Sequence, residues 1–407
     1  MKNILIKSIA LSAISSSILL ASGWRIPEQS STSVALSGAY IANSSGAESS
    51  YFNPANMSFN PNQNQFEADL TYIHLTSIDY KDNVTATKNG DSKKENFFVP
   101  TMFFSSQAKD NLRYGFSITA PGGLSKRWDE AYPEMFAKEF TLKIVEFNPT
   151  VSYKVSDKLA LAGGLRVIYS EGIVKSDGTA AGKPVIRDME GNTIEYGYNI
   201  ALAFKPTTQT NLSLTYRSNV DLKEEGNAKL YLSGTKVYDG GTSVTVPLPA
   251  VLAIACSYKF DTTTVELEYD KTYWSEYENL DFEYDSAIPA VLKPNFDDPQ
   301  TRNWKDTTAY RIGITHKVND KLEMLVGYAK DENPAPTKHL GFELPDSDAT
   351  LYSIGANYKL SKNRTVGIGY LIDIKDDRTV TNNDQGIDGK FTNAKAHLLS
   401  VGYKVDF

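Results

Sequence analysis

Three arginines are the strongest candidates for binding chemistry in this chain of 407 residues. Arg166, Arg217 and Arg311 each lie in a segment of alternating apolar and polar residues, and each falls on the polar side. Each is also seven or eight residues from a short connection, which at about 3.3 Å per residue places all three at a similar height on their strands. The forked donors of a guanidinium suit a carboxylate.

Two interpretations of these arginines follow. One of them binds the carboxylate of a bound molecule, or all three neutralise acids on the same polar face. Acids placed for such pairs are Glu146, Glu266 and Glu268.

The sequence shows no pattern typical of an enzyme or a metal protein. The four histidines are separate in the chain, and none has a second one at the spacing of a metal-binding helix. The run at 382–389 has a weak likeness to a calcium loop but lacks the final Glu of that pattern. We therefore expect no catalysis, no metal and no cofactor.

A long loop between two expected strands carries large apolar groups. Residues 124–137 read LSKRWDEAYPEMFA, which is too long for a turn. Apolar groups on an outer loop commonly mark a binding surface, so Trp128 and Phe136 are predicted to contact a ligand. The alternative is that they pack against neighbouring loops or lipopolysaccharide.

The elements that position these residues are strands. At the C-terminus, Leu399, Val401 and Tyr403 alternate with small or polar residues, which is typical of a strand with one lipid face and one wet face. The same period predicts fourteen strands. They span roughly 64–80, 94–107, 111–120, 141–154, 158–174, 191–205, 209–225, 246–260, 263–275, 305–318, 321–331, 349–360, 363–374 and 394–407.

Short and long connections alternate between these strands, as expected for periplasmic turns and outer loops. Beyond residue 21 no apolar run reaches the roughly 18 residues that a membrane-spanning helix needs. A soluble β-sandwich also has alternating strands, but the alternating connections and the terminal Phe407 favour a barrel. We predict an all-β protein, with residues 63–407 forming a fourteen-stranded antiparallel transmembrane β-barrel.

The N-terminal region cannot join such a wall. Residues 1–21 have the charge, apolar core and small-residue end of a secretory signal peptide. Residues 22–62 are rich in Gly, Ser and Ala and contain the turn Asn53-Pro54-Ala55, so we predict a hatch that fills the lumen and places this turn near the periplasmic mouth. Cys256 is the only cysteine, which excludes an internal disulfide.

The third expected strand ends in Ala120-Pro121-Gly122-Gly123. Proline has no N–H for a strand ladder and glycine weakens strand geometry, so this stretch interrupts pairing with a neighbour. It produces either a gap in the barrel wall or merely the start of an outer loop.

Together these stretches resemble the FadL-type family of outer-membrane proteins, which transport long-chain fatty acids and aromatic hydrocarbons. The motifs that carry the resemblance, in chain order, are GWRIPEQS at 23–30, NPA at 53–55, VPTM at 99–102, NWKDT at 303–307, NPAP at 333–336 and LPDSD at 344–348. The resemblance implies a fourteen-stranded barrel with an internal hatch, a monomer, and an outer capture groove formed by the loop of residues 124–137. It also implies lateral exit at the kinked third strand, and a ligand cavity reached by Trp24. Arg311 is the first candidate for a carboxylate contact because it follows the stretch at 303–307.

We therefore predict passive uptake of hydrophobic small molecules, such as long-chain fatty acids or related hydrocarbons, across the bacterial outer membrane. The expected partners are that ligand and the surrounding membrane lipid. A net charge of −7 argues against nucleic acid. A general or substrate-selective porin for polar solutes is the main alternative, and a purely structural barrel is another.

Overall fold

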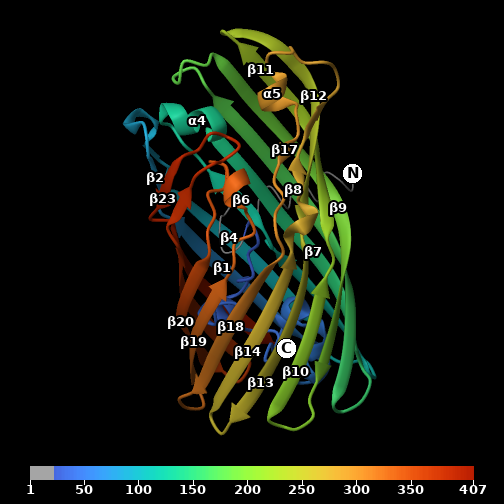
Figure 1. Cartoon of the computed structure of the whole chain (residues 1–407). Coiled ribbons are helices and arrows are strands. Elements are labelled where there is room, and N and C mark those ends of the chain that lie inside the picture. Colours follow the sequence, from blue (N-terminus) through green and yellow to red (C-terminus); the bar gives the residue numbers. More distant parts are fainter. Residues whose placement is uncertain (1–22) are drawn as a thin grey trace.

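The computed structural model describes residues 23–407 and is a closed antiparallel β-barrel with short helices inside and above it (Figure 1). The predicted signal peptide, residues 1–21, lies outside the described residues. The main sheet has eighteen strand segments, and pairing of its first strand with its last, from Gln65 opposite Asp406 to Leu75 opposite Ala396, closes the wall. Four segments are short additions or continuations, so the wall has fourteen strands, as predicted.

The wall strands run in chain order around the barrel. They are β1 (Gln65–Leu75), β4 (Glu95–Ser105), β5 (Leu112–Thr119) continued by β6 (Gly123–Lys126), β7 (Glu139–Lys154), β8 (Leu159–Asp177), β9 (Val185–Phe204), β10 (Thr210–Arg217) continued by β11 (Val220–Leu232), β12 (Thr235–Leu248) continued by β13 (Ala250–Phe260), β14 (Thr263–Tyr273), β18 (Thr307–Lys317), β19 (Leu322–Asp331), β20 (Ala349–Ser361), β21 (Arg364–Lys375) and β24 (Lys395–Asp406).

The remaining elements lie in the hatch or the outer loops. The hatch contains α2 (Ser31–Ala35), α3 (Ser49–Phe52) and the 3-10 helix η1 (Pro54–Phe59). The outer loops contain β2 (Asp79–Asp82), η2 (Ala86–Lys88), β3 (Gly90–Asp91), α4 (Ala131–Ala137), η3 (Trp274–Glu276), β15 (Asn279–Leu280), β16 (Phe282–Tyr284), α5 (Lys293–Phe296), β17 (Gln300–Thr301), η4 (Thr337–His339), β22 (Arg378–Val380) and β23 (Gly389–Thr392). None of the helices described is long and apolar enough to cross a membrane.

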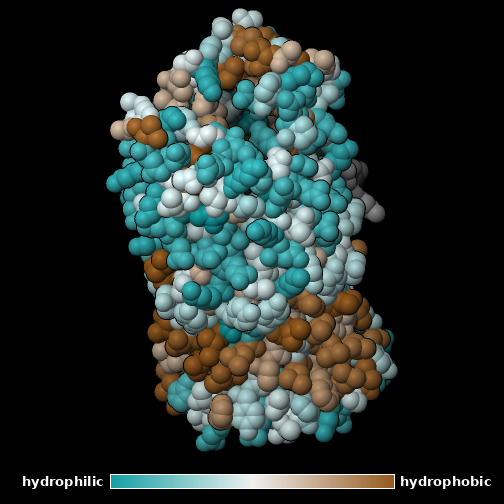
Figure 2. Space-filling view, in the orientation of Figure 1, coloured by the Kyte–Doolittle hydropathy of each residue, from teal (hydrophilic) through white to brown (hydrophobic). Residues whose placement is uncertain are grey.

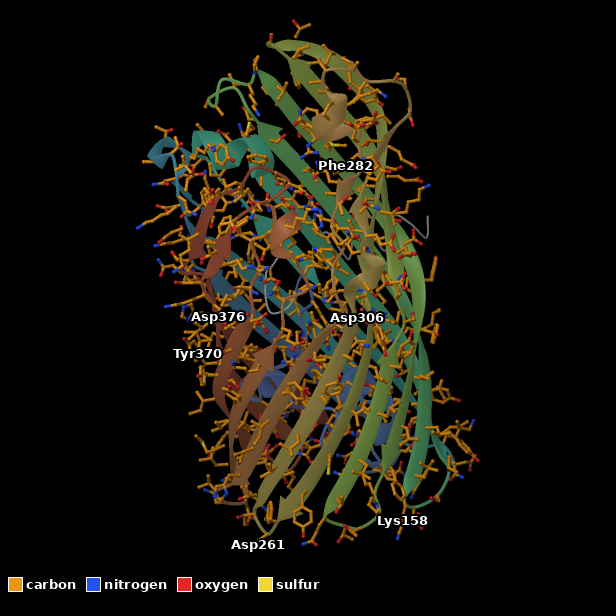
Figure 3. The ribbon with its side chains drawn as sticks, viewed as in Figure 1. Lys158, Asp261, Phe282, Asp306, Tyr370 and Asp376 are labelled. Atoms are coloured by element: carbon orange, nitrogen blue, oxygen red, sulfur yellow. The ribbon has the colours of Figure 1, made fainter. Side chains whose placement is uncertain are left out.

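An apolar belt crosses the lower part of the barrel on the face that Figure 2 shows. Its origin is the period of two, because Leu399, Val401 and Tyr403 are exposed on the outside of β24 while Leu398 and Ser400 are buried inside. The short turns, marked by Lys158 and Asp261, lie below this belt (Figure 3). The wall continues far above it, so a large part of the protein stands outside the membrane.

This outer part differs most from the predicted strands. β8 and β9 are 19 and 20 residues long, and β11 with β12 forms a tall hairpin of which 226–232 and 235–245 were not predicted. Above the membrane a strand has no lipid face, so its sequence loses the apolar alternation. Pro249 separates β12 from β13 because it has no N–H to donate. The first predicted strand ends at Leu75, and β2 instead joins a small outer sheet.

The hatch fills the lower lumen, where α2 packs against the inner face of β20 and β21. The wall has glycines at this contact. A Cβ at Gly369 would collide with the carbonyl oxygen of Ser31, and one at Gly327 would collide with the backbone of Leu36. These glycines let the helix backbone approach the sheet closely.

Candidate functional site

Two wall carboxylates bind the hatch backbone. The Glu268 carboxylate accepts hydrogen bonds from the N–H groups of Tyr40 and Ile41, at 3.0 and 3.3 Å. The Glu266 carboxylate accepts from the N–H groups of Ala42 and Asn43, at 2.6 and 2.8 Å. These four hydrogen bonds fix the hatch to β14. The structure therefore differs from the expectation that both acids pair with the lumen arginines.

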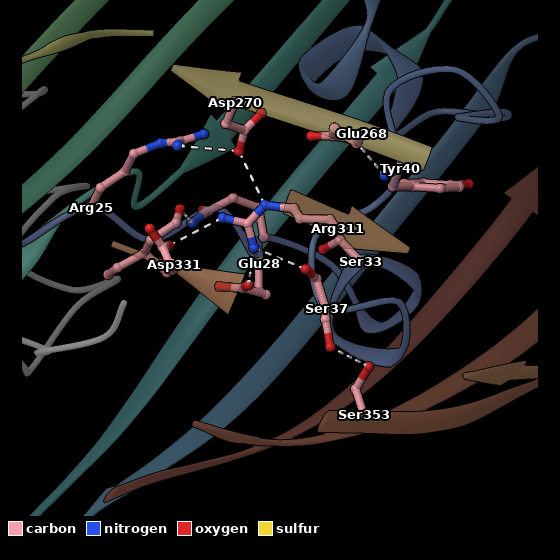
Figure 4. A network of polar contacts seen from close by, with 12 residues as sticks. Arg25, Glu28, Ser33, Ser37, Tyr40, Glu268, Asp270, Arg311, Asp331 and Ser353 are labelled. Atoms are coloured by element: carbon pink, nitrogen blue, oxygen red, sulfur yellow. Dashed lines mark hydrogen bonds and ion pairs between the residues drawn. The ribbon is translucent and has the colours of Figure 1, made fainter. Parts of the chain in front are cut away.

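Arg311 also fixes the hatch (Figure 4). Its Nε lies 3.0 Å from the Asp270 carboxylate, its Nη2 3.3 Å from Asp331, and its Nη1 donates to the carbonyl oxygen of Ser37 at 2.9 Å. The side chain is fully buried. All three nitrogens of the guanidinium have partners within the protein, so the geometry gives no support to Arg311 as the first candidate for a cargo carboxylate.

Glu28, in the hatch, lies 3.6 Å from the Arg311 guanidinium. Burial raises the pKa of the Glu28 carboxyl to about 7, although Arg311 acts in the opposite direction. Glu28 therefore adds less than a full negative charge at neutral pH.

The other two predicted arginines share one acid. Arg166 pairs with Glu146 at 2.9 Å, and Arg217 contacts the other oxygen of the same carboxylate. Both arginines line an internal cavity of about 60 Å³, and Arg25, Ile26, Pro121 and Leu248 also line it. A cavity of this size holds only a few water molecules.

The turn at Asn53-Pro54-Ala55 lies toward the short-turn end of the barrel. Asn53 begins η1, its side-chain oxygen accepting from the Ala55 N–H at 3.1 Å and its side-chain nitrogen donating to the Ser213 hydroxyl at 2.9 Å. Ala55 is buried among the small residues Ala160, Ala201 and Ala203, which stand at the lower ends of β8 and β9.

The wall is interrupted where the sequence predicted it. β4 pairs with β5 only over Met102–Ser105, so the outer half of β4 lacks β5 as a partner. On the other side, Thr119 pairs with Glu146 and Gly123 pairs with Lys143. Three residues, 120–122, therefore stand opposite two on β7, which is a β-bulge. The strand resumes as β6, so this stretch interrupts a strand and does not simply begin a loop.

The N-terminal segment of residues 24–29 occupies this interruption. Its backbone pairs with the bulge, because the Ile26 N–H donates to the Pro121 carbonyl and the Gly123 N–H donates to the Trp24 carbonyl, at 2.9 and 2.8 Å. The Gln29 amide donates to the Ala120 carbonyl and accepts from its N–H, both at 2.8 Å. On the β4 side, the Thr101 hydroxyl donates to the Gln29 carbonyl at 2.7 Å. The chain's own N-terminal segment thus connects the bulge with β4 at this interruption.

Trp24 lies in an aromatic cluster beside this segment. Its ring centroid is 4.8 Å from those of Trp274 and Trp304 and 5.2 Å from that of Tyr277. Its indole N–H is buried without a hydrogen-bond partner. Trp24 is therefore ordered, and its neighbours Arg25 and Ile26 line the internal cavity, although Trp24 itself does not.

Two aromatic residues of the loop at 124–137, Trp128 and Phe136, have different surroundings. Trp128 is 1% exposed, its ring lies 5.3 Å from that of Phe342, and its indole N–H donates to the Phe342 carbonyl at 2.9 Å. The expectation that Trp128 is displayed to a ligand is wrong, because the outer loops form their own apolar core. Phe136, on α4, lines an outer groove of about 420 Å³. We name this cavity the outer groove.

A model of the family described as outer membrane protein transport protein (OMPP1/FadL/TodX) matches residues 12–407. The chain belongs to this family. It is 23% identical over 322 residues to outer membrane protein P1 of Haemophilus influenzae, covering 70% of this chain and 68% of that one. It is 22% identical over 346 residues to the long-chain fatty acid transport protein of Escherichia coli O6:H1, covering 75% and 76%.

Solved structures agree with the barrel fold of the family. A Pseudomonas aeruginosa FadL homologue superposes with a TM-score of 0.83 at 18% identity, covering 95% of this chain and all of that one. The Ralstonia pickettii toluene transporter TbuX gives a TM-score of 0.71 at 17% identity, covering 93% and 98%. The chain is an outer-membrane barrel of a transport family and not an enzyme. Within residues 23–407, no group of three or more His, Cys, Asp or Glu side chains is placed to hold a metal ion.

Gln29 is the main functional candidate in this family member that the sequence did not single out. It connects the bulge to β4, yet it lies in a stretch without period or charge pattern. Its only sequence signal is its place in GWRIPEQS, which supports the family match but predicts no contact.

Proposed function

We propose that this protein takes up hydrophobic small molecules, such as long-chain fatty acids or related hydrocarbons, by passive diffusion, and that it acts as a monomer. Cargo enters at the outer groove, reaches the internal cavity, and leaves sideways through the wall at Ala120–Gly123 when the segment of residues 24–29 moves. The observation that carries this proposal is the β-bulge, because the N-terminal segment of the same chain, and not a wall strand, pairs with it there. Pro121 of the bulge and Ile26 of the N-terminal segment both line the internal cavity, so the cavity adjoins the interruption in the wall.

The relatives support the hydrophobic nature of the cargo. The relatives compared include a long-chain fatty acid transport protein, and the similar folds include a toluene transporter. Ile26, Ile41, Leu248 and Val251 give the cavity an apolar lining that suits the chain of a carboxylated or a neutral hydrocarbon. The hatch must move to make room for this cargo, because about 60 Å³ holds only a few water molecules. We also propose that Trp24 contacts cargo, because a ligand acceptor would satisfy its buried N–H.

A porin for polar solutes is the alternative, and a transport assay separates the two. Vesicles containing the purified protein should accumulate dodecanoate and toluene faster than protein-free vesicles, whereas arabinose should enter at the protein-free rate. A hatch that leaves a cavity of about 60 Å³ provides no continuous water path for a sugar. Arabinose entry with no gain for the hydrophobic solutes would support the porin and contradict our proposal.

Arg217 is the internal arginine best placed for a carboxylate. It lines the cavity, 16% of its side chain is exposed, and its Nε has no partner. We expect Arg217→Gln to weaken binding of dodecanoate by about 1.5 to 3 kcal/mol, the usual range for a hydrogen bond to a charged group, and to leave binding of dodecane almost unchanged. Titration calorimetry in detergent would give both affinities.

Arg311→Gln is the matched control, because Arg311 neutralises Asp270 and Asp331 and does not line the cavity. It should lower barrel stability, since it leaves acids unpaired, while the ratio of the two affinities stays constant. An unchanged ratio in Arg166→Gln, Arg217→Gln and Arg311→Gln alike would remove the internal carboxylate site and leave hydrophobic transport intact.

A further inference from the structure

Arg187 is a buried cation without an acidic partner. It stands at the outer end of β9 and is 6% exposed. The rings of Phe282 and Phe296 each lie 5.1 Å from its Cζ. Its Nε and Nη1 are buried and have no hydrogen-bond partner. An aromatic face attracts a guanidinium but gives its N–H groups no lone pair, so burial of these donors is costly unless a ligand completes them.

Arg187 itself lines the outer groove, close to Phe282, which is labelled in the upper region of Figure 3. Apolar side chains lie on both sides of Arg187, in a lining that also includes polar residues such as Asn295 and Gln300. Met135, Phe136 and Phe140 come from the region of α4, while Leu280 and Phe296 come from the loop that includes α5. The groove therefore combines apolar side chains with a buried cation that forms no ion pair.

The other charged groups of the groove are already matched or exposed. Arg302 pairs with Glu343 at 2.8 Å, and His339 lies 2.8 Å from Asp384. Lys183 is exposed on the turn between β8 and β9. Among the groove-lining residues that the structure describes, Arg187 is thus the buried cation that forms no ion pair, although the charges of Glu343 and Arg302 both act on it.

We propose that the outer groove is selective for amphipathic carboxylates, with the head group bound by the Arg187 guanidinium and the alkyl chain on the apolar surface. The guanidinium fork matches the two oxygens of a carboxylate, and the flanking rings hold its plane in position. A neutral hydrocarbon of the same length gains the apolar contacts alone. Arg187 is then the residue that distinguishes a fatty acid from a neutral hydrocarbon at the first step of uptake.

This inference rests on the proposed function, but binding at the groove can be measured separately from transport. We would replace Cys256 by Ala and Thr301, which lines the groove, by Cys, and attach an environment-sensitive fluorophore at position 301. Titrating the full-length protein with dodecanoate and with methyl dodecanoate reports occupancy of the groove. Arg187→Gln should weaken dodecanoate binding by at least about tenfold and change methyl dodecanoate binding little.

Two further variants separate recognition from general charge. Lys183→Gln removes an exposed cation of the same groove and should leave the ratio of the two affinities unchanged. Arg187→Lys keeps the charge but loses the planar fork, so it should recover only part of the discrimination.

An equal loss for both ligands, or an unchanged ratio, in Arg187→Gln would overturn the inference. A parent protein that binds neither ligand at the groove would also overturn it. Arg187-dependent binding without accumulation of dodecanoate in vesicles would contradict the transport proposal and leave the carboxylate site standing. Accumulation of dodecanoate without Arg187-dependent binding would contradict the carboxylate site and leave the transport proposal standing.

Discussion

Removal of residues 23–62 is expected to convert the protein into an open channel with a large, steady conductance. The hatch leaves only a small cavity in the lumen, and the wall of fourteen strands closes without it through the β1–β24 pairing. Single-channel recording in planar bilayers would measure the effect. The intact protein should show only brief, small openings under the same conditions.

Two controls test whether the conductance comes from the lost hatch. The double variant Glu266→Gln and Glu268→Gln keeps the hatch but replaces one acceptor oxygen of each side chain by an NH2 donor, so the variant should open intermittently. Circular dichroism should show that the deletion variant keeps its strand content. A folded deletion variant that is as silent as the intact protein would contradict the assignment of the hatch.

Deletion of the single residue Pro121 is expected to abolish uptake of hydrophobic cargo. Three residues stand opposite two at the bulge, so removing one restores a continuous register from Thr119 to Gly123 on β7. The continuous strand formed by β5 and β6 can then pair with the outer half of β4. This pairing fills the gap and displaces the segment of residues 24–29. Accumulation of dodecanoate in vesicles should fall to the rate of vesicles without protein.

Pro121→Ala is the matched control for this deletion. It restores a backbone N–H but keeps the extra residue, so the bulge and the uptake should both persist. Binding of dodecanoate at the outer groove should survive in both variants, because the groove is formed by other loops. Undiminished uptake after the deletion would show that cargo does not leave through this part of the wall.

The sequence was sufficient for the architecture of the barrel. The period of two around Leu399 and Val401, the alternating connections and the Gly- and Ser-rich start each have a direct physical cause, namely lipid on one face, short turns on one side, and a segment without strand period. The interruption at Pro121 was also predictable, because proline has no N–H. The sequence did not show whether this interruption leaves a gap in the barrel wall or simply begins an outer loop.

Side-chain partners could not be predicted in the same way. Strand parity placed Arg311 in the lumen, but only the fold shows that Ser37, Asp270 and Asp331 use its donors. Trp128 is an apolar residue in a loop, and its burial depends on Phe342, more than 200 residues away. Arg187 lay outside the predicted strand 191–205, because the outer part of β9 has no lipid face to produce a pattern.

The route of the cargo through the wall is tested most directly by photolabelling. A diazirine-bearing dodecanoate would be added to vesicles containing the full-length protein, activated by light, and mapped by mass spectrometry. Lateral exit predicts labels at the outer groove, at the segment of residues 24–29, and on both sides of the gap, at 97–101 and 120–123. Those last labels should disappear when Pro121 is deleted. Labels that instead continue past Ala55 to the lower ends of β8 and β9, and that persist in the deletion variant, would show passage straight through the barrel and contradict lateral exit.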